Sequence, residues 1–518
     1  MKKLYMAVLA IFMVLATSCT GDLDQRPKIG TTADNVYSTV DGYKSMMAKI
    51  YASFVLKGDN KGGGDDIGTF GGYELWRSYF NLQEGSTDVA AFRWVSGDNL
   101  WGLSYLSWDA NDGQNADTYY RIYYTVALCN EFLRYCGNVS SFSADEQALI
   151  ANLSAEARFM RAMCYEMILD LYRQGAFVDE TAPTSGYFPP CYAAADLLNY
   201  VETELTDILP ALPDHPDYAR AGKGAAYALL ARMYLNAETY TGTPRYDDCI
   251  AACKNVMALG YTLEPEWLKL FNADNDKRTN EIIFALASDA TEAVTWGGGT
   301  YLVCGSVGSD NKQKGPDYGI STGWGNFRAT GAFYDLFDEN DGRRVFYTGE
   351  QDQYITNSIE DGKQGYHMCK FTNLTDDGAP ASNSAADGCN TDIPVFRLSE
   401  IYLTAAEAVL RGGQGMSVDE ALGLVNQIRQ RAFNGNSGNL AAADLTLDFI
   451  IDERGRELYM ECVRRTDLVR FDRFTTGAYL WEWKGGIASG RAVDSRYNYF
   501  PIPAAEISAN PNLKNIGY

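Results

Sequence analysis

Histidine is almost absent from this sequence, which contains only His215 and His367. Neither residue has a serine or cysteine motif around it. A Ser-His-Asp triad needs a histidine as its general base, and most catalytic zinc sites need two or three histidine ligands. The chain therefore offers very little material for either kind of active site.

Positive charge is also in short supply, because 44 Lys and Arg residues face 67 Asp and Glu residues, giving a formal net charge of -23. Such an excess of carboxylate repels phosphate groups, which argues against nucleic acid as a partner. The 11 cysteines form no C-x-x-C pair. The spacings Cys129/Cys136 and Cys249/Cys253 place each pair on one helix face, so we interpret them as small core residues, with disulfides left open.

Long apolar runs are missing except at the start, where Leu4–Leu15 follows Lys2 and Lys3. This run is too short for a membrane span, which needs roughly 20 apolar residues. Ala16-Thr17-Ser18 and then Cys19 follow it and resemble a lipoprotein cleavage site, although the usual leucine lies one position early. We predict a signal peptide at 1–18, lipidation of Cys19 and a tether over 19–33. The alternative is an ordinary secretory signal in which Cys19 is incidental.

What the chain has in abundance is aromatic residues, at 13% of the sequence. The stretch from Thr291 to Arg328 has no helical period and sets Trp296, Tyr301, Tyr318 and Trp324 among glycines. Glycine permits backbone turns that other residues avoid, and loops often carry function. Either the rings pack onto a core or they face a ligand. We expect Trp296 and Trp324 to face a ligand and Tyr301 to anchor the loop.

A second aromatic region runs from Lys57 to Asn115 and also loses the helical pattern. It contains Trp76, Trp94, Trp101 and Trp108. We expect Trp76, Trp101 and Trp108 to form the core of this loop region, and Trp481 and Trp483 to be packing residues beside the last helix.

The remaining chain reads as helices with apolar residues at threes and fours. The segments that we expect to be helical are Ala33–Phe54, Tyr120–Cys136, a long helix opened by the capping-box spacing at 143–146, Asp196–Leu209, Gly224–Tyr240, Tyr246–Leu259, Phe396–Leu410, Val418–Ala432 and Thr446–Phe474. Two of them share a Y-L-x-A tetrapeptide, at 234–237 and 402–405, and each is followed by a turn and a second helix. Helical hairpins of roughly 34 residues with small residues at the crossing are typical of tetratricopeptide repeats, although any two antiparallel helices look similar.

The sequence therefore predicts a mostly α fold with a tetratricopeptide-like scaffold of helical hairpins. Residues 34–518 are expected to form a single domain, interrupted by long irregular loops around 57–115 and 287–330. Rigid helices that carry two aromatic loop regions are the layout expected of a binding protein.

Several stretches resemble the SusD/RagB family, in the right order along nearly the whole chain. They are D-L-D-Q-R-P after Cys19, E-A-R-F-M-R-A-M-C-Y at 156–165, K-G-A-A-Y-A-L-L-A-R-M-Y-L at 223–235, R-L-S-E-I-Y-L-T-A-A-E-A at 397–408 and E-R-G-R-E-L-Y-M-E at 453–461. The resemblance implies a lipoprotein of the outer membrane, exposed on the cell surface, that binds glycans and acts as the lid of a SusC-like TonB-dependent transporter.

The segments T-Y-L-V-C-G at 300–305, T-G-W at 322–324 and T-T-G-A-Y-L-W-E-W-K-G-G at 475–486 resemble the starch-binding founding member in particular. This implies an aromatic arc of Trp94, Trp296 and Trp324 for an α-glucan, where the founding member has a tyrosine in place of Trp296. The further residues implied in polar contacts with sugar hydroxyls are Arg77, one of Asp65 and Asp66, and one of Asp98 and Asn99. Sugar rings pack their C–H faces on aromatic rings, and their hydroxyls take charge-assisted hydrogen bonds.

The acidic run Asp274-Asn275-Asp276 looks like a ligand cluster for a hard cation. The resemblance implies a structural calcium ion here, with Asp392 as a distant carboxylate ligand; a solvated turn is the alternative. No cofactor is expected to be required.

The sequence predicts a non-catalytic cell-surface lipoprotein that binds starch and malto-oligosaccharides and delivers them to the transporter. Another glycan in the same role is the first alternative. A helical glycoside hydrolase is the second, but it needs two carboxylates flanking the scissile bond, and Glu292 and Asp317 in the aromatic loop have no evident partner. A pure protein-binding scaffold is the third.

Overall fold

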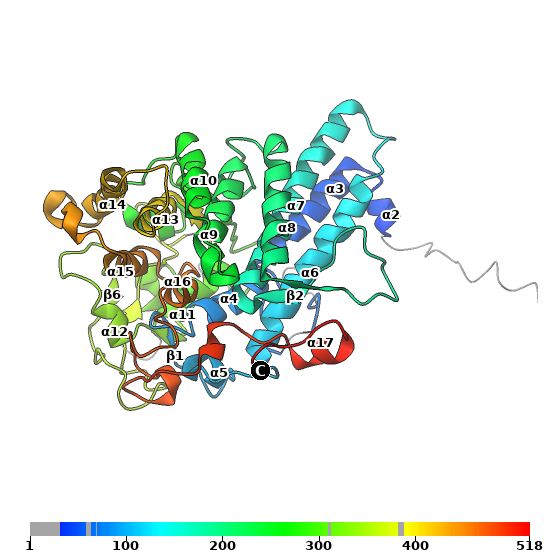
Figure 1. The fold of residues 1–518 in the computed structure, drawn as a ribbon. Coiled ribbons are helices and arrows are strands. Elements are labelled where there is room, and N and C mark those ends of the chain that lie inside the picture. Colours follow the sequence, from blue (N-terminus) through cyan, green and yellow to red (C-terminus); the bar gives the residue numbers. More distant parts are fainter. Residues whose placement is uncertain (1–31, 59–63, 69, 309–311, 382–387) are drawn as a thin grey trace, which may run out of the picture. The chain divides into compact units, whose positions relative to one another are not determined.

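The computed structural model describes residues 32–58, 64–68, 70–308, 312–381 and 388–518 (Figure 1). Cys19 and the predicted signal peptide lie outside these residues. The chain divides into two compact units, residues 1–46 and 47–518. Helix α2 (Ala33–Val36) starts where the Thr32 side chain accepts a hydrogen bond from the Asn35 N–H, and α3 is Val40–Ala52. The single helix predicted over Ala33–Phe54 is therefore two helices, separated at residues 37–39.

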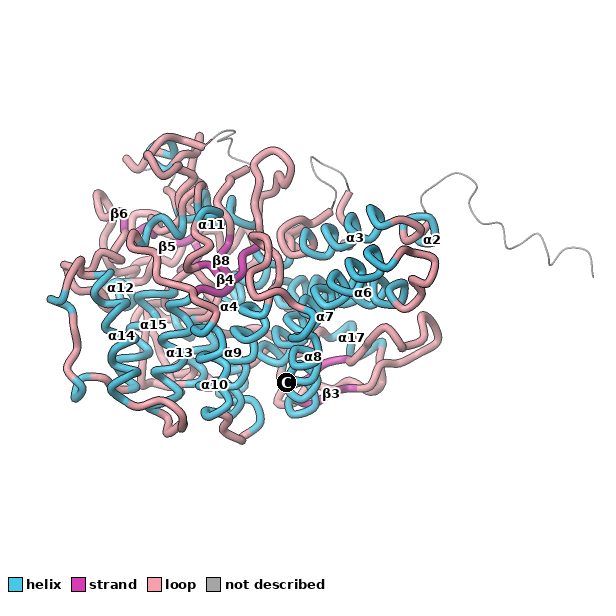
Figure 2. The backbone as a smooth tube through the Cα atoms, turned by 90° about the horizontal axis from the view of Figure 1, so that it is seen from above, coloured by secondary structure: helices cyan, strands magenta, loops and turns pink. Residues whose placement is uncertain are grey.

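A series of long helices packs side by side in the second unit (Figure 2). They are α6 (Gly113–Cys136), α7 (Ala144–Tyr172), α8 (Ala194–Ile208), α9 (Lys223–Thr241), α10 (Tyr246–Ala258), α13 (Leu398–Leu410) and α14 (Val418–Ala432). Each helix packs on the next in this order. Capping boxes at Ser143/Glu146 and Ser417/Glu420 fix where α7 and α14 begin. The predicted helical scaffold is confirmed.

The two segments with the shared tetrapeptide are the first helices of two neighbouring hairpins. Helix α9 pairs with α10, α13 pairs with α14, and α10 packs on α13 between them. In both tetrapeptides the alanine, Ala237 and Ala405, is fully buried. Small residues let the helix axes approach closely, and stacked hairpins bury their faces on each other, as in tetratricopeptide arrays.

The strands are short and pair in antiparallel twos: β1 (Ala91–Phe92) with β5 (Phe327–Arg328), β2 (Gln174–Ala176) with β3 (Cys191–Ala193), β4 (Ile282–Leu286) with β8 (Ile393–Arg397), and β6 (Phe346–Tyr347) with β7 (His367–Met368). The β1–β5 pair involves both aromatic regions. It ties the region 57–115 to the region 287–330 by main-chain hydrogen bonds.

Both regions contain helices that the sequence pattern concealed. The first has α4 (Leu75–Gln83) and α5 (Trp101–Tyr105), and the second has α11 (Gly298–Ser306). The prediction that Thr291–Arg328 lacks helix was therefore wrong. Every residue of α4 and of α11 is buried, polar residues included, so neither helix has the solvent-facing side of a surface helix.

The helix predicted over Thr446–Phe474 is also divided, into α15 (Leu447–Leu458) and α16 (Arg464–Arg470). Met460 and Cys462 have φ of 64° and 62° between the two helices. A left-handed backbone cannot continue an α-helix. The remaining helices are α12 (Gly331–Tyr334) and α17 (Ala504–Ala509), with 3₁₀ turns at η1 (Leu209–Ala211), η2 (Trp267–Phe271), η3 (Asn275–Lys277), η4 (Gly315–Tyr318), η5 (Asn436–Gly438), η6 (Ala442–Asp444), η7 (Lys484–Gly486) and η8 (Ser495–Asn498).

A fully buried network of ion pairs joins β8, α14 and α15. The Glu457 carboxylate pairs with three guanidinium groups. It lies 3.0 Å from that of Arg343 and 2.6 Å from that of Arg431, and it also contacts that of Arg397. Buried charges are tolerated only when they are paired and hydrogen-bonded. Although burial alone would raise the pKa of Glu457, the three arginines lower it far below its ordinary value.

The described residues contain ten cysteines, and most of them are buried. The Cys249 thiol donates to the Ala231 carbonyl oxygen at 3.4 Å. Burial raises the pKa of Cys129 to about 12. These thiols behave as small core residues, as predicted. No helix within the described part of the chain combines the length and apolar character that crossing a membrane requires.

Candidate functional site

Helix α11 is the base of the candidate site, and Glu74 fixes its beginning. The Glu74 carboxylate accepts a hydrogen bond from the Gly298 N–H at 2.8 Å and another from the Arg77 N–H at 3.1 Å. It therefore caps the first turns of both α11 and α4. A Cβ at Gly297 would lie 1.6 Å from Glu74 Oε1, and one at Gly299 would lie 1.8 Å from the Thr391 carbonyl oxygen. The glycine run is required by this close approach.

Two of the predicted tryptophans are held at opposite ends of α11. Trp296 directly precedes the N-cap Gly297, and its side chain is 63% exposed. Trp324 is half-buried, and its main-chain N–H donates to the Cys304 carbonyl oxygen, in the last turn of the helix, at 2.7 Å. Seven residues of helix between 297 and 304 correspond to about 10 Å along its axis. One rigid element thus sets the spacing of the two main chains.

The β1–β5 pair brings the third tryptophan, Trp94, next to the main chain of Trp324. The Arg93 N–H donates to the Asn326 carbonyl oxygen at 2.7 Å, which continues the ladder past the strands. The Trp94 indole Nε1 then donates to the Trp324 carbonyl oxygen at 3.4 Å, and the Trp94 side chain is 45% exposed. The Arg93 guanidinium lies 5.1 Å from the centre of the Trp94 ring. Residues from both aromatic regions meet here.

The Arg77 side chain contacts residues of both aromatic regions. Its side chain is only 6% exposed, and Nη1 donates to the Trp296 carbonyl oxygen at 2.9 Å. The guanidinium lies between two rings, 3.7 Å from the centre of Tyr73 and 4.2 Å from that of Tyr301. In this structure Arg77 holds the main chain of Trp296, which is a positioning role.

The four acidic and amide candidates differ in their surroundings. Asp98 is half-buried beside Arg77 and Tyr73; burial raises its pKa, while Arg77 opposes the rise. Asn99 is exposed, with φ of 52°. Asp65 pairs with the Lys57 ammonium at 3.1 Å, and Asp66 with that of Lys49 at 2.6 Å. The charges of Asp65 and Asp66 are thus already balanced by lysines.

The other predicted aromatic roles are mostly confirmed. Tyr301 is buried and donates its hydroxyl to Asn81 Oδ1 at 2.9 Å, so it anchors the loop. Trp76, Trp108 and Trp481 are buried as expected. The prediction for Trp101 was wrong, because its side chain is 37% exposed at the start of α5.

The three candidate calcium ligands lie around η3. Asp274 pairs with the Lys277 ammonium at 2.8 Å and accepts a hydrogen bond from the Asp376 N–H at 2.8 Å. Asp392 accepts from the Ser288 N–H at 2.6 Å, and burial raises its pKa to about 7, with Asp276 adding to the rise. Within the described residues no three His, Cys, Asp or Glu side chains are grouped so as to hold a metal ion. Asp392 is buried and Asp276 is exposed, and a cation would relieve their like charges, so calcium here stays a prediction.

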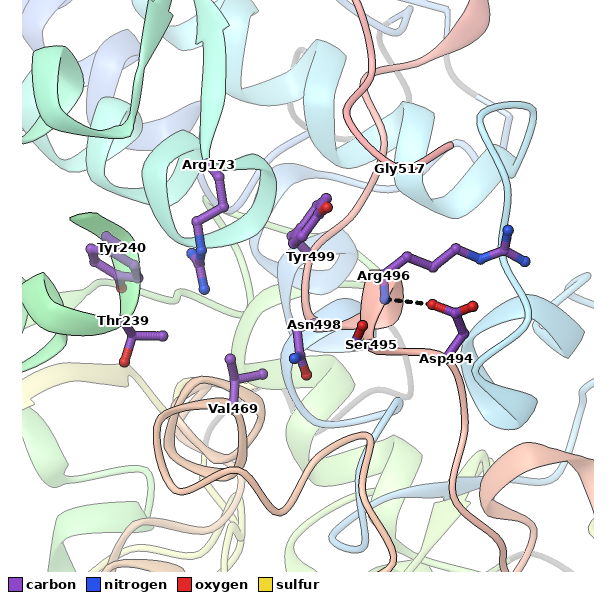
Figure 3. A pocket seen from close by; sticks show the side chains of 10 residues that line it. All are labelled: Arg173, Thr239, Tyr240, Val469, Asp494, Ser495, Arg496, Asn498, Tyr499 and Gly517. Atoms are coloured by element: carbon purple, nitrogen blue, oxygen red, sulfur yellow. Dashed lines mark hydrogen bonds between the residues drawn. The ribbon is translucent and has the colours of Figure 1, made fainter. Parts of the chain in front are cut away.

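A polar hollow of about 570 Å³ lies elsewhere, where α7, α9 and α16 end. Figure 3 shows Arg173 reaching into it, while the Arg496 side chain points away and its main-chain N–H donates to Asp494. None of the predicted site residues lines this hollow. Its Arg173 guanidinium donates to the Leu169 carbonyl oxygen at 2.9 Å, so it serves the C-terminus of α7.

Sequence reasoning missed two residues of the site, Tyr73 and Glu74. Neither has the pattern of a site residue, because Glu74 is buried and Tyr73 stands in a short loop before α4. The available signal was Glu74 ahead of a short apolar helix, which is a weak capping signature.

The assembled site is an open surface of flat rings with polar groups at its edges. Trp296 and Trp94 are exposed, although tryptophan is costly to leave in water. Such a surface can bind a ligand that has a flat C–H face and hydrogen-bonding groups around its rim.

The profile of the SusD family matches residues 347–518. Over the whole chain the sequence is 31% identical to the starch-binding protein SusD of Bacteroides thetaiotaomicron, covering 99% of that protein. It is 25% identical to a SusD-like protein of Bacteroides ovatus, over 70% of this chain and 67% of that protein.

Solved structures agree with the fold. A SusD-like protein from Bacteroides fragilis superposes with a TM-score of 0.71 at 22% identity, covering 94% of this chain and 99% of that one. Surface glycan-binding protein A from Bacteroides thetaiotaomicron, in complex with laminarihexaose, gives 0.69 at 19% identity, covering 92% and 99%.

Proposed function

This chain belongs to the SusD family, and from that membership we propose that it is a non-catalytic surface protein that binds α-glucan. In this proposal Trp94, Trp296 and Trp324 carry the binding, and a TonB-dependent transporter receives the oligosaccharide. The anchor is a lipid on Cys19 at the outer membrane. The observation that carries the proposal is the hydrogen bond between Trp94 and Trp324 across the two loop regions, with Trp296 directly before the N-cap of α11 and the Trp324 main chain bonded to the last turn of that helix.

Starch is the glycan that we favour because the relative at 31% identity is named a starch-binding protein. The main chains of Trp296 and Trp324 are fixed at the two ends of α11. The helix therefore spaces the two residues along a line that is longer than one sugar ring. A curved α-glucan offers successive C–H faces along such a line. The alternative is a β-glucan such as laminarin, which one of the structural neighbours binds.

The carboxylates around the tryptophans favour binding over hydrolysis. A glycosidase needs one carboxylic acid to donate a proton and a second carboxylate across the bond. The Oε1 atom of Glu74 accepts hydrogen bonds from the Gly298 and Arg77 N–H groups, and Asp98 lies close to Arg77. Glu292 is exposed, and its N–H donates to Asp289 Oδ1 at 2.8 Å within a local turn.

Affinity electrophoresis in gels that contain amylopectin tests the proposal. We expect the wild-type protein to be retarded and the variant with Trp296→Ala and Trp324→Ala to migrate freely. The matched control is Phe188→Ala, which removes an equally exposed ring from another loop and should change nothing. If the wild-type protein migrates freely in amylopectin gels but is retarded in laminarin gels, the proposed ligand becomes a β-glucan. Release of shorter sugars from maltoheptaose would contradict the absence of catalysis.

Calcium and the lipid anchor have separate tests. If Asp276 and Asp392 hold calcium, millimolar calcium raises Tm and Asp392→Asn removes that rise. A bound ion at 100 times its Kd stabilises the folded state by about 2.7 kcal/mol. If Cys19 is lipidated, cells fed radiolabelled palmitate label the wild-type chain and not Cys19→Ser.

A further inference from the structure

Three aromatic rings form a continuous strip on the surface beside the candidate site. Trp101 and Tyr105 of α5 have ring centres 5.2 Å apart, and Tyr105 stacks on Trp483 at 5.9 Å with an interplanar angle of 26°. Helix α5 is labelled at the lower edge of Figure 1 and packs on η7, which follows Trp483. Trp101 is 37% exposed, while Tyr105 and Trp483 are half-buried. We call these three residues the α5 strip.

One residue of the strip, Trp483, is held in an unfavourable backbone conformation. Trp483 has φ of 69°, a left-handed conformation that is rare for a bulky residue. Its indole Nε1 donates to the Ile355 carbonyl oxygen at 2.9 Å, and its main-chain N–H donates to the Ile487 carbonyl oxygen at 3.0 Å. Such strain persists only where surrounding contacts impose it, and it concentrates at functional positions.

The strip is continuous with the candidate site through one loop. Residues 94–100 fold into a compact turn, in which the Asp98 N–H donates to the Trp94 carbonyl oxygen at 2.9 Å. The Glu360 carboxylate accepts from the Ser96 N–H at 2.7 Å and lies close enough to Tyr105 to add to the burial that raises its pKa. Glu360 therefore borders both the turn that carries Trp94 and the α5 strip.

The chemistry of the strip matches that of the tryptophans nearby. Within the described residues, neither the Trp101 indole N–H nor the Tyr105 hydroxyl has a hydrogen-bond partner. The Glu360 carboxylate stands near Tyr105 at the edge of the strip. Flat rings with unused donors and an acceptor at the rim suit a hydroxylated ring better than the apolar face of a protein helix.

We propose that the α5 strip is a second carbohydrate-binding surface, which takes further sugar rings of a long glucan whose other part lies on Trp94, Trp296 and Trp324. This inference rests on the proposed function. It implies that the ligand is a polymer, because a short oligosaccharide cannot cover both surfaces.

Affinity electrophoresis with amylopectin tests it on the full mature chain. We expect Trp101→Ala and Tyr105→Ala each to weaken retention by about five- to ten-fold, the loss of one ring–sugar contact. Phe188→Ala should migrate like the wild type. Retention of Trp101→Ala equal to that of Phe188→Ala overturns the second surface while leaving the proposed function intact. Migration of the wild type that no glucan retards overturns both.

A measurement on the wild-type protein avoids dependence on the folding of a variant. Hydroxyl-radical footprinting records the oxidation rate of each tryptophan with and without amylopectin. We expect the polymer to protect Trp101 at least about three-fold, alongside Trp94 and Trp296. Protection of Trp94 and Trp296 with Trp101 unprotected contradicts the second surface, and is the result expected if the strip instead seats a protein.

Discussion

The indole nitrogen of Trp94 lies 3.4 Å from the carbonyl oxygen of Trp324, a residue 230 positions later in the chain. Together with the β1–β5 pair, this hydrogen bond joins the two aromatic regions beside the exposed ring of Trp94. The donor belongs to a side chain and the acceptor to a main chain, so the position of Trp94 depends on the backbone of Trp324 and not on its ring.

The variant Trp94→Phe distinguishes the contribution of the Trp94 ring to glucan binding from that of its hydrogen bond. The variant keeps a flat apolar face but loses the donor to the Trp324 carbonyl oxygen. We expect glucan affinity to fall by about five-fold, since one neutral hydrogen bond contributes about 1 kcal/mol. Trp94→Ala should lose considerably more. Calorimetric titration with maltoheptaose measures both, and equal losses would mean that the ring itself contributes nothing.

Gly297→Ala should disrupt the site without touching any ring. The new Cβ would fall 1.6 Å from Glu74 Oε1 and force the carboxylate away from the Gly298 N–H. We expect a loss of about 1–3 kcal/mol in the free energy of unfolding, measured in urea, together with weaker glucan binding. Gly423→Ala in α14 is the control, because a Cβ there meets nothing within 4 Å. It should be neutral or stabilise by about 0.5–1 kcal/mol.

Arg77→Met tests whether Arg77 acts through Trp296. The variant removes the hydrogen bond to the Trp296 carbonyl oxygen and leaves an apolar chain between Tyr73 and Tyr301. We expect affinity to fall by about three- to ten-fold. In a Trp296→Ala background the same change should cost almost nothing more, as expected for coupled positions. Additive losses would instead indicate that Arg77 contacts the sugar directly.

Glu457→Gln should be one of the most damaging isosteric changes in the chain. It removes the negative charge shared by Arg343, Arg397 and Arg431, all of them buried. Breaking a buried ion network from one side costs about 3–5 kcal/mol. Asp448→Asn removes a carboxylate that pairs with Arg473 at the surface and should change stability by less than about 1 kcal/mol. Thermal unfolding of both variants gives the comparison, and similar Tm values would contradict it.

Glu84→Gln should change how stability depends on pH. Glu84 follows α4, accepts a hydrogen bond from the Val463 N–H at 3.2 Å, and burial raises its pKa to about 8. Above pH 5 the unfolded chain releases this proton while the folded chain keeps it. Stability contributed by the neutral acid is therefore lost as pH rises from about 5 to 8, by up to about 1.4 kcal/mol per unit.

The glutamine variant has no proton to lose, so its stability should fall less steeply with pH than that of the wild type. Urea unfolding at pH 5, 6, 7 and 8 measures the two slopes. Parallel slopes would show that Glu84 is already ionised in the folded protein. The comparison uses the difference between slopes because Glu166, whose pKa is also raised to about 8 by burial, contributes equally to both proteins.

Helix α14 could be predicted because its apolar residues recur along one buried face while the other face meets solvent. Val418–Ala432 is an example in which the predicted and observed bounds coincide. Helices α4 and α11 were missed because each has only nine residues, and α11 contains three glycines. The division of Thr446–Phe474 was hidden for another reason: Met460 and Cys462 adopt positive φ without being glycine.

The exposed tryptophans of the site could be picked out by their glycine-rich surroundings and by resemblance. Their support could not, because Glu74 and Arg77 act on main-chain atoms of residues more than 200 positions away. A contact between a side chain and a distant backbone leaves no trace in local spacing. Trp101 was misjudged for a similar reason, since its exposure depends on where α5 lies on the folded surface.

Helix α11 has a consequence for how this protein can change over generations. The main chains of Trp296 and Trp324 are fixed by hydrogen bonds to Arg77 and Cys304, and these bonds do not involve the indole rings. Mutation can therefore exchange the rings for tyrosine, phenylalanine or polar side chains while their spacing is inherited intact. If these rings bind the glycan as proposed, ligand preference can change by substitution at Trp296 and Trp324 while the main-chain hydrogen bonds that set their spacing remain.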